Sequence, residues 1–340
     1  MNIKEDKVLL SHGNGGRIMH SLITGLFVKH FGNRILNRQN DSAILPVDGS
    51  EIAFTTDSFV IDPIFFPGGD IGKLAVCGTV NDLSVAGAEP LFISVSFIIE
   101  EGFTMKDLET IVISLASEAK KAGVLIVTGD TKVVNKGKCD KIFINTSGIG
   151  RIRSENKMEG KTRSIHEGDV ILINGGIGEH GMAVMNAREG FRFKTAVESD
   201  CASLNRLIGD VLSNTVSVKF MRDPTRGGLA TVLNELCGKM PLGIQLDEAA
   251  LPVSKGVRAI CEILGFDPLY VANEGKVVMV ASEKESRKIL SVMRKHKTGR
   301  QSAVIGKIVK DHPGKVVLRT ETGGKRIIDS LSGDPLPRIC

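Results

Sequence analysis

Apolar segments of strand length alternate with helical segments along this chain, and the alternation occurs twice. In the first half, the strand-like segments 51–57 and 90–99 lie on either side of a mostly apolar helical segment at 70–88. The segment 151–168 is charged and has no apolar period, and the alternation restarts after it. Because 340 residues exceed one typical hydrophobic core, the pattern predicts two α/β domains.

Several segments carry their own helix signals. Apolar residues at 18–27 recur at i, i+3 and i+4 and predict a helix after the turn "SHGNGG" at 11–16. Thr104 and Asp107 have the spacing of a capping box at the start of an amphipathic helix that runs through Lys121. In the second half we expect helices near 201–213 and 254–264, the "RDPTRGGL" turn followed by a helix within 222–238, and a strand at 243–247.

The composition argues against several functional classes. The formal net charge is only +5, and with no Trp and one Tyr the chain lacks the aromatic platforms on which single-stranded nucleic acid stacks. The longest apolar run, at 90–99, is about half a membrane span and is typical of a buried strand. No secretory signal is recognisable, so we expect a cytoplasmic protein without a membrane or nucleic-acid partner.

The cysteines are scattered, and one of them is the last residue. No CxxC pair occurs, so the pattern favours neither a disulfide framework nor a zinc site. The final segment "DPLPRIC" contains two prolines and follows Gly333, which predicts an extended, mobile tail that can move the Cys340 thiol. The other five have mostly apolar neighbours typical of small core residues: Cys77, Cys139, Cys201, Cys237 and Cys261.

Four aspartates lie in similar settings and are candidate ligands. Asp57 and Asp130 end probable strands, the second at 124–130, whereas Asp82 lies on an otherwise apolar helix. Asp41 lies in "NDSAIL". Oxygen ligands without His or Cys favour a hard cation, and Mg²⁺ is commonly held by a few carboxylates together with nucleotide phosphates. Each aspartate taken singly could equally cap a helix or turn.

Three further segments carry polar groups with open interpretations. The glycine-rich turn at 12–16 precedes a helix and could present backbone N–H groups to phosphate, although no Walker motif is present. Arg222 and Arg226 flank a turn before a helix, which suits either an anion or plain solvation. Glu274 in "VANEGKVV" is either a general base or an exposed turn residue.

The motifs "GGDIGKLAVCGTVNDLSVAGAEP", "TGDTKVV", "RDPTRGGL", "NEGK" and terminal "PRIC" occur together and in order. This set resembles the HypE family of hydrogenase maturation factors, carbamoyl dehydratases of the aminoimidazole ribonucleotide synthetase (PurM-like) superfamily. The resemblance covers nearly the whole chain. One departure is Ser42, which stands where the superfamily usually has the second of two paired aspartates.

The resemblance implies a two-domain PurM-like fold of the α/β (α+β) class. The N-terminal domain would form a homodimer through a β-barrel-like interface, with ATP and Mg²⁺ in a cleft along it, and a C-terminal α/β domain and a flexible tail would follow. The implied division is a glycine-rich segment and helix at 1–38, an ATP-binding and dimerisation domain at 39–155, a second domain at 156–330 and the tail at 331–340.

The resemblance also implies a reaction. Members receive a carbamoyl group from HypF on the sulfur of a C-terminal cysteine, here Cys340, and use ATP to dehydrate it to a thiocyanate. The cyano group then passes to iron held by HypC and HypD and becomes a cyanide ligand of [NiFe] hydrogenase. By motif position, Glu274 would be the base, Lys132 would steady phosphate charge or relay a proton, and Asn273 would complete the catalytic set.

The same motifs supply the expected ligand sites. The metal ligands would be Asp41, Asp57, Asp82 and Asp130. The nucleotide would be bound by His12, Gly13, Asn14, Gly15, Asp57, Asn81, Asp82, Gly129, Asp130 and Thr131.

Two other functions stay open from the sequence. The chain could be another PurM-like kinase or synthetase, although selenophosphate synthetase needs a reactive Cys or selenocysteine near its glycine-rich segment, and "SHGNGG" has none. It could also be an ATP-responsive thiol carrier that uses Cys340 without dehydrating anything. A loss of water from a carbamoylated tail distinguishes the enzyme from the carrier.

Overall fold

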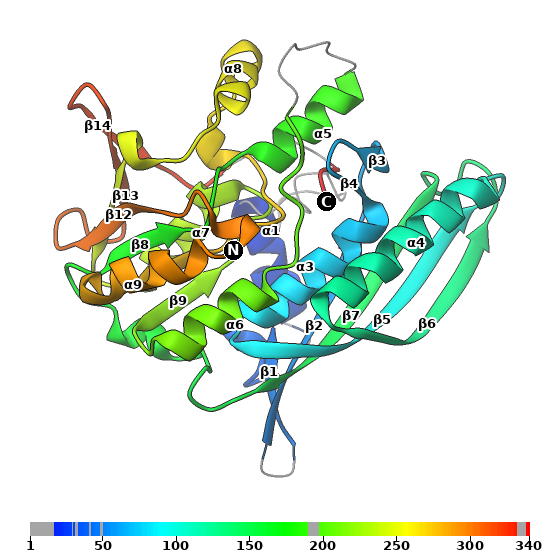
Figure 1. The fold of residues 1–340 in the computed structure, drawn as a ribbon, viewed down its shortest axis with the longest axis horizontal. Helices are drawn as coiled ribbons and strands as arrows, with labels where there is room; N and C mark the ends of the chain where they lie inside the picture. The colour runs from blue at the N-terminus through cyan, green and yellow to red at the C-terminus, as the bar shows by residue number, and fades with distance from the viewer. Residues whose placement is uncertain are drawn as a thin grey trace.

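Two β-sheets with their covering helices make up the protein (Figure 1). The computed structural model describes residues 17–28, 30, 33–40, 42–47, 50–189, 197–331 and 338–340. Sheet strands run from Ala43 to Ile152 in the first half and from Val170 to Ile328 in the second. The chain is therefore mixed α/β, as the alternating pattern predicts.

The first sheet has five strands in the order β1-β2-β7-β5-β6. Its neighbours pair antiparallel except β5 and β6, which are parallel and are connected by helix α4. Figure 1 shows α3 and α4 on the same face of this sheet. The elements of this half are α1 (Arg17–Leu22), η2 (Ile23–Val28), η3 (Leu36–Arg38), β1 (Ala43–Val47), β2 (Ser50–Phe59), β3 (Phe65–Phe66), β4 (Gly69–Asp70), α3 (Ile71–Val85), β5 (Ala88–Glu100), α4 (Met105–Ala122), β6 (Leu125–Val134) and β7 (Ile142–Ile152).

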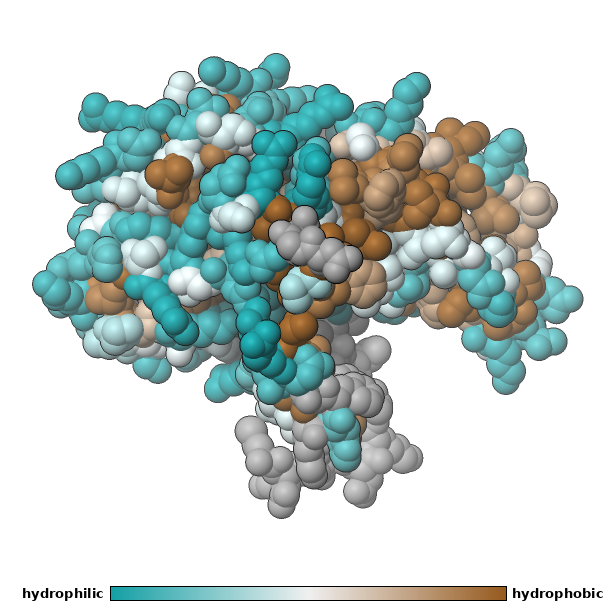
Figure 2. All heavy atoms as spheres, turned by 90° about the horizontal axis from the view of Figure 1, so that it is seen from below, coloured by the Kyte–Doolittle hydropathy of each residue, from teal (hydrophilic) through white to brown (hydrophobic). Residues whose placement is uncertain are grey.

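The face of this sheet that points away from α3 and α4 is the open face. Phe54, Phe92, Ile98 and Ile149 lie on it and are 37–44% exposed. Figure 2 shows apolar side chains gathered where this sheet forms the surface. Within one chain the described strands form an open sheet and not a closed barrel, so a barrel-like interface needs a second copy.

The second sheet has seven strands in the order β14-β13-β10-β12-β8-β11-β9. Along β8, Ile171 and Ile173 pack into one hydrophobic cluster with α7, and Val170 and Leu172 pack into another with α6 and α9. The elements of this half are η4 (Lys161–Ser164), β8 (Val170–Ile173), α5 (Glu179–Glu189), α6 (Asn205–Asn214), β9 (Val218–Arg222), α7 (Gly228–Cys237), β10 (Gly243–Asp247), η5 (Glu248–Ala250), α8 (Lys255–Leu264), η6 (Pro268–Tyr270), β11 (Val278–Ala281), α9 (Glu283–Met293), η7 (Lys297–Gly299), β12 (Ala303–Val309), β13 (Val316–Arg319) and β14 (Lys325–Ile328).

Most predicted elements are confirmed, and two strand ends are corrected. The Thr104 hydroxyl accepts a hydrogen bond from the Asp107 N–H at 3.0 Å and caps α4, as the sequence predicts. Strands β2 and β6 do not end at Asp57 and Asp130 but continue to Phe59 and Val134. Both aspartates therefore lie inside strands, where the pleat and not a turn sets the direction of their side chains.

Two segments from the second half return to the first. Asn81 of α3 donates to the Ala202 carbonyl at 3.1 Å, and the Ser199 N–H donates to the Pro67 carbonyl at 2.8 Å. At the C-terminus, the Val60 N–H donates to the Cys340 carbonyl at 3.1 Å. In the described part of the chain no helix is both long and apolar enough to cross a membrane.

Candidate functional site

Two predicted metal ligands lie where α3 packs on β2. The Thr79 hydroxyl of α3 donates to Asp57 Oδ2 of β2 at 3.1 Å, and the Thr55 hydroxyl of β2 donates to Asp82 Oδ2 of α3 at 2.9 Å. Thr55 and Asp57 share one face of the strand, and Thr79 and Asp82 are about one helical turn apart. This reciprocal pairing brings the two half-buried carboxylates to one side of the contact.

Arg226 is the cation of this site. It precedes α7 in the "RDPTRGGL" turn and is exposed. Electrostatic interactions with Cys340, when its sulfur is ionised, and with Glu274, Asp57 and Asp82 raise the pKa of the Arg226 guanidinium. An exposed guanidinium among several acidic groups can bind the oxygens of a phosphate or an amide. Of its two interpretations, the anion-binding one is supported by this placement.

Glu274 is buried beside this cation. Only 3% of the residue is exposed, and its Oε1 has no hydrogen-bond partner among the described residues. Burial raises the pKa of Glu274 well above the ordinary value, and the charges of Asp200, Asp223 and Asp57 add to this, whereas Arg226 opposes it. A buried carboxyl with a raised pKa is a common feature of groups that transfer protons in active sites. The exposed-turn interpretation of Glu274 is therefore wrong.

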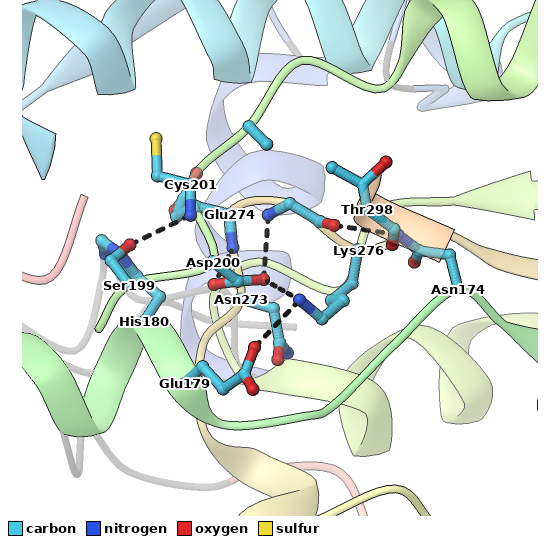
Figure 3. Close-up of polar contacts among 12 residues, drawn as sticks. Asn174, Glu179, His180, Ser199, Asp200, Cys201, Asn273, Glu274, Lys276 and Thr298 are labelled. Atoms are coloured by element: carbon cyan, nitrogen blue, oxygen red, sulfur yellow. Dashed lines mark hydrogen bonds and ion pairs between the residues drawn. The ribbon is translucent and has the colours of Figure 1, made fainter. Parts of the chain in front are cut away.

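The loop that carries Glu274 is held by Asp200 (Figure 3). The Asp200 carboxylate accepts hydrogen bonds from the N–H groups of Glu274 at 3.2 Å and Gly275 at 3.0 Å. Lys276 lies 3.0 Å from Asp200 and 3.2 Å from Glu179. Burial raises the pKa of Asp200, but Lys276 and the other contacts outweigh it, so the pKa is lowered and the carboxylate stays charged.

Residues 338–340, the docked tail, reach this site from the other end of the chain. Beside the Cys340 contact to Val60, the Arg338 carbonyl accepts from the Asp62 N–H at 3.4 Å and from Arg188 Nη2 at 2.7 Å. The tail was predicted to be mobile, and in this structure its last three residues are bound to the body of the protein.

The docked thiol is a poor nucleophile. Burial raises the pKa of Cys340 to about 12, with Glu274, Asp57 and Asp223 adding to the shift. The cation that opposes the shift is Arg226. The neighbouring Arg338 forms an ion pair with Asp140 instead. At neutral pH the docked sulfur is therefore a thiol.

The structure does not bring Asp130 to Asp57 within one chain. Asp57 is in register with Thr146 of β7, Thr146 with Val95 of β5, and Val95 with Gly129 of β6, so three strand spacings, about 14 Å, separate the positions. Asp130 follows Gly129, and because side chains alternate along a strand it points to the open face.

Asp130 and Lys132 form an exposed ion pair on β6. Lys132 Nζ lies 2.7 Å from Asp130 Oδ2, and the side chains are 68% and 61% exposed. Hydrogen bonding from Lys132 lowers the pKa of Asp130. Gly129 and Thr131 occupy the same exposed strand. These four predicted site residues thus form a second group, separate from the Asp57 and Asp82 pair.

The two predicted asparagines have structural contacts. Asn81 accepts from the Leu204 N–H at 2.8 Å and donates to the Glu274 carbonyl at 3.3 Å. Asn273 accepts from the Gly178 N–H at 2.8 Å and donates to the Pro224 carbonyl at 2.9 Å. Both side chains hold the segments around the site in place.

The remaining predicted ligands, His12, Gly13, Asn14, Gly15 and Asp41, lie outside the described residues. Within the described ranges, no three His, Cys, Asp or Glu side chains are grouped to hold a metal ion. Asp57 and Asp82 nevertheless fit Mg²⁺, which needs only one or two carboxylates when phosphates and water complete its shell.

Three residues of the site were not predicted: His180, Asp200 and Asp223. Their contacts join positions far apart in sequence, such as His180 with Ile339 and Asp200 with Glu274. The sequence signal was weak, because a single histidine or aspartate has no local pattern that marks a site. Arg226 was considered only as one of two arginines flanking a turn.

Two family models match the chain. The AIR synthase related protein N-terminal domain matches residues 39–152, and the C-terminal domain matches residues 166–319. A thiamine monophosphate kinase complexed with AMPPCP and TMP has a TM-score of 0.70 at 15% identity and covers 96% of this chain and 99% of its own. That likeness shows the fold alone.

Much closer relatives cover the full length. Carbamoyl dehydratase HypE of Cupriavidus necator is 47% identical over 341 residues, covering 100% of this chain and 97% of the relative. The corresponding Escherichia coli protein is 45% identical, with coverages of 98% and 100%. A HypE–HypF complex structure gives a TM-score of 0.85 at 47% identity, covering 92% of this chain and 100% of the other. A HypE structure in complex with ATP gives 0.82 at 46% identity, with coverages of 98% and 100%. The chain therefore belongs to the AIR synthase related proteins and, within them, to the HypE family of carbamoyl dehydratases.

Proposed function

We propose that this protein converts an S-carbamoyl group on Cys340 into a thiocyanate at the expense of ATP, and so supplies cyanide ligands for the iron of [NiFe] hydrogenase. The observation that carries the proposal is the docked tail: Cys340 is bound to Val60 through its main-chain oxygen, and its sulfur is buried where the charges of Arg226 and Glu274 act on it. Full-length relatives are carbamoyl dehydratases, and one of them has been crystallised with ATP.

The reaction must turn an amide oxygen into a leaving group. The oxygen attacks the γ-phosphorus of ATP and ADP leaves; the nitrogen loses both protons, the C–O bond breaks, and phosphate and the nitrile form. Glu274 is our candidate for the base, because it is buried in the site, its pKa is raised and its Oε1 has no hydrogen-bond partner among the described residues. Arg226 would bind the oxygen that becomes negatively charged.

Asp57 and Asp82 would hold Mg²⁺, which when bound neutralises charge on the phosphoryl group being transferred. The hydroxyls of Thr79 and Thr55 orient these carboxylates. The nucleotide site would also include residues 12–15, Asp41 and Asn81. Asn273 would support the loop that carries Glu274.

The open face is the proposed surface of a homodimer. It combines exposed apolar side chains with the exposed strand β6, which is the kind of edge that natural proteins cover. In such a dimer, Asp130, Lys132 and the Gly129 and Thr131 backbone would enter the partner's nucleotide site. Homodimer formation would thereby reunite two groups of site residues that are separate in one chain.

HypF would load the carbamoyl group, and the HypC and HypD complex would accept the cyano group. A HypE–HypF complex structure of a relative supports the first partner.

The six cysteines are all free, which suits the reducing cytoplasm. We propose that the boundary between the N-terminal and C-terminal domains lies between residues 155 and 156.

The test follows the mass of the C-terminal peptide. The protein is loaded with HypF, carbamoyl phosphate and ATP, and the peptide is expected to lose one water in an ATP-dependent step. Cys340→Ser should carry no carbamoyl group, whereas Cys139→Ser should behave as the wild type. In a single turnover, Glu274→Gln is expected to be slower by about a thousandfold, within the usual range for general acid–base catalysis. A carbamoylated peptide that never loses water would show a thiol carrier and not a dehydratase.

A further inference from the structure

The docked tail is held from two sides. The N–H groups of Val60 and Asp62 donate to the main-chain oxygens of Cys340 and Arg338, so the tail runs antiparallel to residues 60–62. In an extended chain successive carbonyls point in opposite directions. The Ile339 carbonyl therefore points away from residues 60–62, and a different partner must bind it.

That partner is His180, the second residue of α5. Its Nε2 lies 2.7 Å from the Ile339 carbonyl oxygen, and the residue is fully buried. The ring stands edge-on to Phe66, with centroids 5.4 Å apart and planes at 89°. The imidazole thus has a fixed position at the end of the tail's binding groove.

The hydrogen bonds assign the tautomer of His180. A carbonyl oxygen only accepts, so Nε2 carries the proton and donates to Ile339. Nδ1 then accepts from the Ser199 hydroxyl at 2.7 Å, and Ser199 Oγ in turn accepts from the Cys201 N–H at 3.1 Å (Figure 3). Burial lowers the pKa of His180, which keeps the ring neutral. Each hydrogen bond in this series therefore has a defined donor and a defined acceptor.

We propose that His180 is a positioning residue that fixes the register of the tail, by binding the carbonyl directly before the reacting cysteine. A slip of one residue would turn the Ile339 carbonyl away from His180 and move the Ile339 side chain, now only 3% exposed, out of its apolar site. The bond therefore selects the one register that places the Cys340 sulfur beside Arg226 and Glu274. This inference deepens the proposed dehydration.

The proposal separates the two steps of the reaction. Dehydration takes place with the tail docked and depends on its register. Loading by HypF needs the sulfur outside this site, where no contact with His180 exists. Loss of the His180 hydrogen bond should therefore impair dehydration and spare loading, which a general loss of folding would not do.

The test compares His180→Leu, which removes the donor, with His180→Gln, which keeps an N–H that can reach the same carbonyl. Three rates are measured in the full-length protein: alkylation of Cys340 by a maleimide, carbamoylation by HypF, and single-turnover dehydration. For His180→Leu we expect alkylation to rise and dehydration to fall by about tenfold each, the worth of one neutral hydrogen bond, with carbamoylation unchanged. In His180→Gln, both the alkylation rate and the dehydration rate should return most of the way to the wild-type values.

Two results would overturn the proposal: equal alkylation and dehydration rates in His180→Leu and the wild type, or a His180→Gln variant as defective as His180→Leu with carbamoylation reduced in parallel. A wild-type protein that is carbamoylated but never dehydrated would overturn the proposed function instead. In that case the alkylation rates still decide whether His180 holds the tail.

Discussion

The two sheets of this protein differ in how they are covered. In the seven-stranded sheet, every residue of β8 and β11 is buried, and separate hydrophobic clusters pack on its two faces. In the five-stranded sheet, α3 and α4 cover one face, whereas Phe92 and Ile98 remain exposed on the other. The second half is a complete scaffold, and the first half has an apolar surface that another protein surface can cover.

The two halves of the molecule contribute different residues to the site. The complete half fixes Glu274 through Asp200 and receives the tail through His180. The incomplete half carries Asp57 and Asp82 on its covered face and Asp130 and Lys132 toward its open one. In the proposed homodimer, these two groups of side chains would come together in one site.

The largest expected effect comes from mixing subunits. Asp82→Asn and Asp130→Asn should each abolish dehydration when alone. Hybrid dimers of the two should contain one site with both carboxylates intact, so random mixing restores about a quarter of wild-type activity in the peptide mass assay.

The control adds Ile98→Asp to both subunits, which places a charge on the open face. These variants should stay monomeric in analytical ultracentrifugation and recover nothing on mixing. Val216→Asp, at a residue that is 87% exposed in the other half, should leave complementation intact. Inactive hybrid dimers would contradict a site shared between subunits.

A smaller effect should separate the two sheets by stability. Leu172→Ala removes a fully buried side chain from β8 and should lower the free energy of unfolding by about 3 kcal/mol. Ile98→Ala on the open face should cost less than about 1 kcal/mol in dilute protein and make the melting temperature less dependent on concentration. Urea unfolding measures both, and equal losses would show that the two faces are covered alike.

The smallest effect concerns pH. An undocked thiol has a pKa of about 8.5, whereas burial raises the pKa of docked Cys340 to about 12. Docking is therefore at full strength below about pH 8.5 and weakens as the pH rises toward the docked value, by about 1.4 kcal/mol per pH unit. The rate of Cys340 alkylation, divided by that of a free peptide with the sequence 334–340, should be constant below pH 8.5 and rise above it. A ratio that stays flat through pH 10 would contradict a docked thiol of raised pKa.

Local patterns predicted much of this fold, and long-range contacts were beyond them. The cap of Thr104 on α4 depends on neighbours three residues apart, and the sequence shows it directly. The joint placement of Asp57 and Asp82 was expected only from the family resemblance, which gives both as metal ligands. Strand β6 was ended too early because Asp130 looks like a turn residue, although Thr131 to Val134 continue the strand.

Other features have no local signature. The hydrogen bond between His180 and Ile339 spans 159 positions, and the sequence around either residue does not indicate it. The open face could not be identified either, because alternating apolar residues in β5 look the same whether a helix or a second copy covers them. Only the packing of α3 and α4 on one side reveals which face remains.

Arg338 adopts a φ of 56°, a left-handed backbone conformation that costs a residue other than glycine about 1 kcal/mol. The bonds to Val60, Asp62 and His180 hold the end of the chain in this conformation, and the strain is relieved when they break. The backbone strain at Arg338 therefore offsets part of the free energy that these hydrogen bonds contribute to docking.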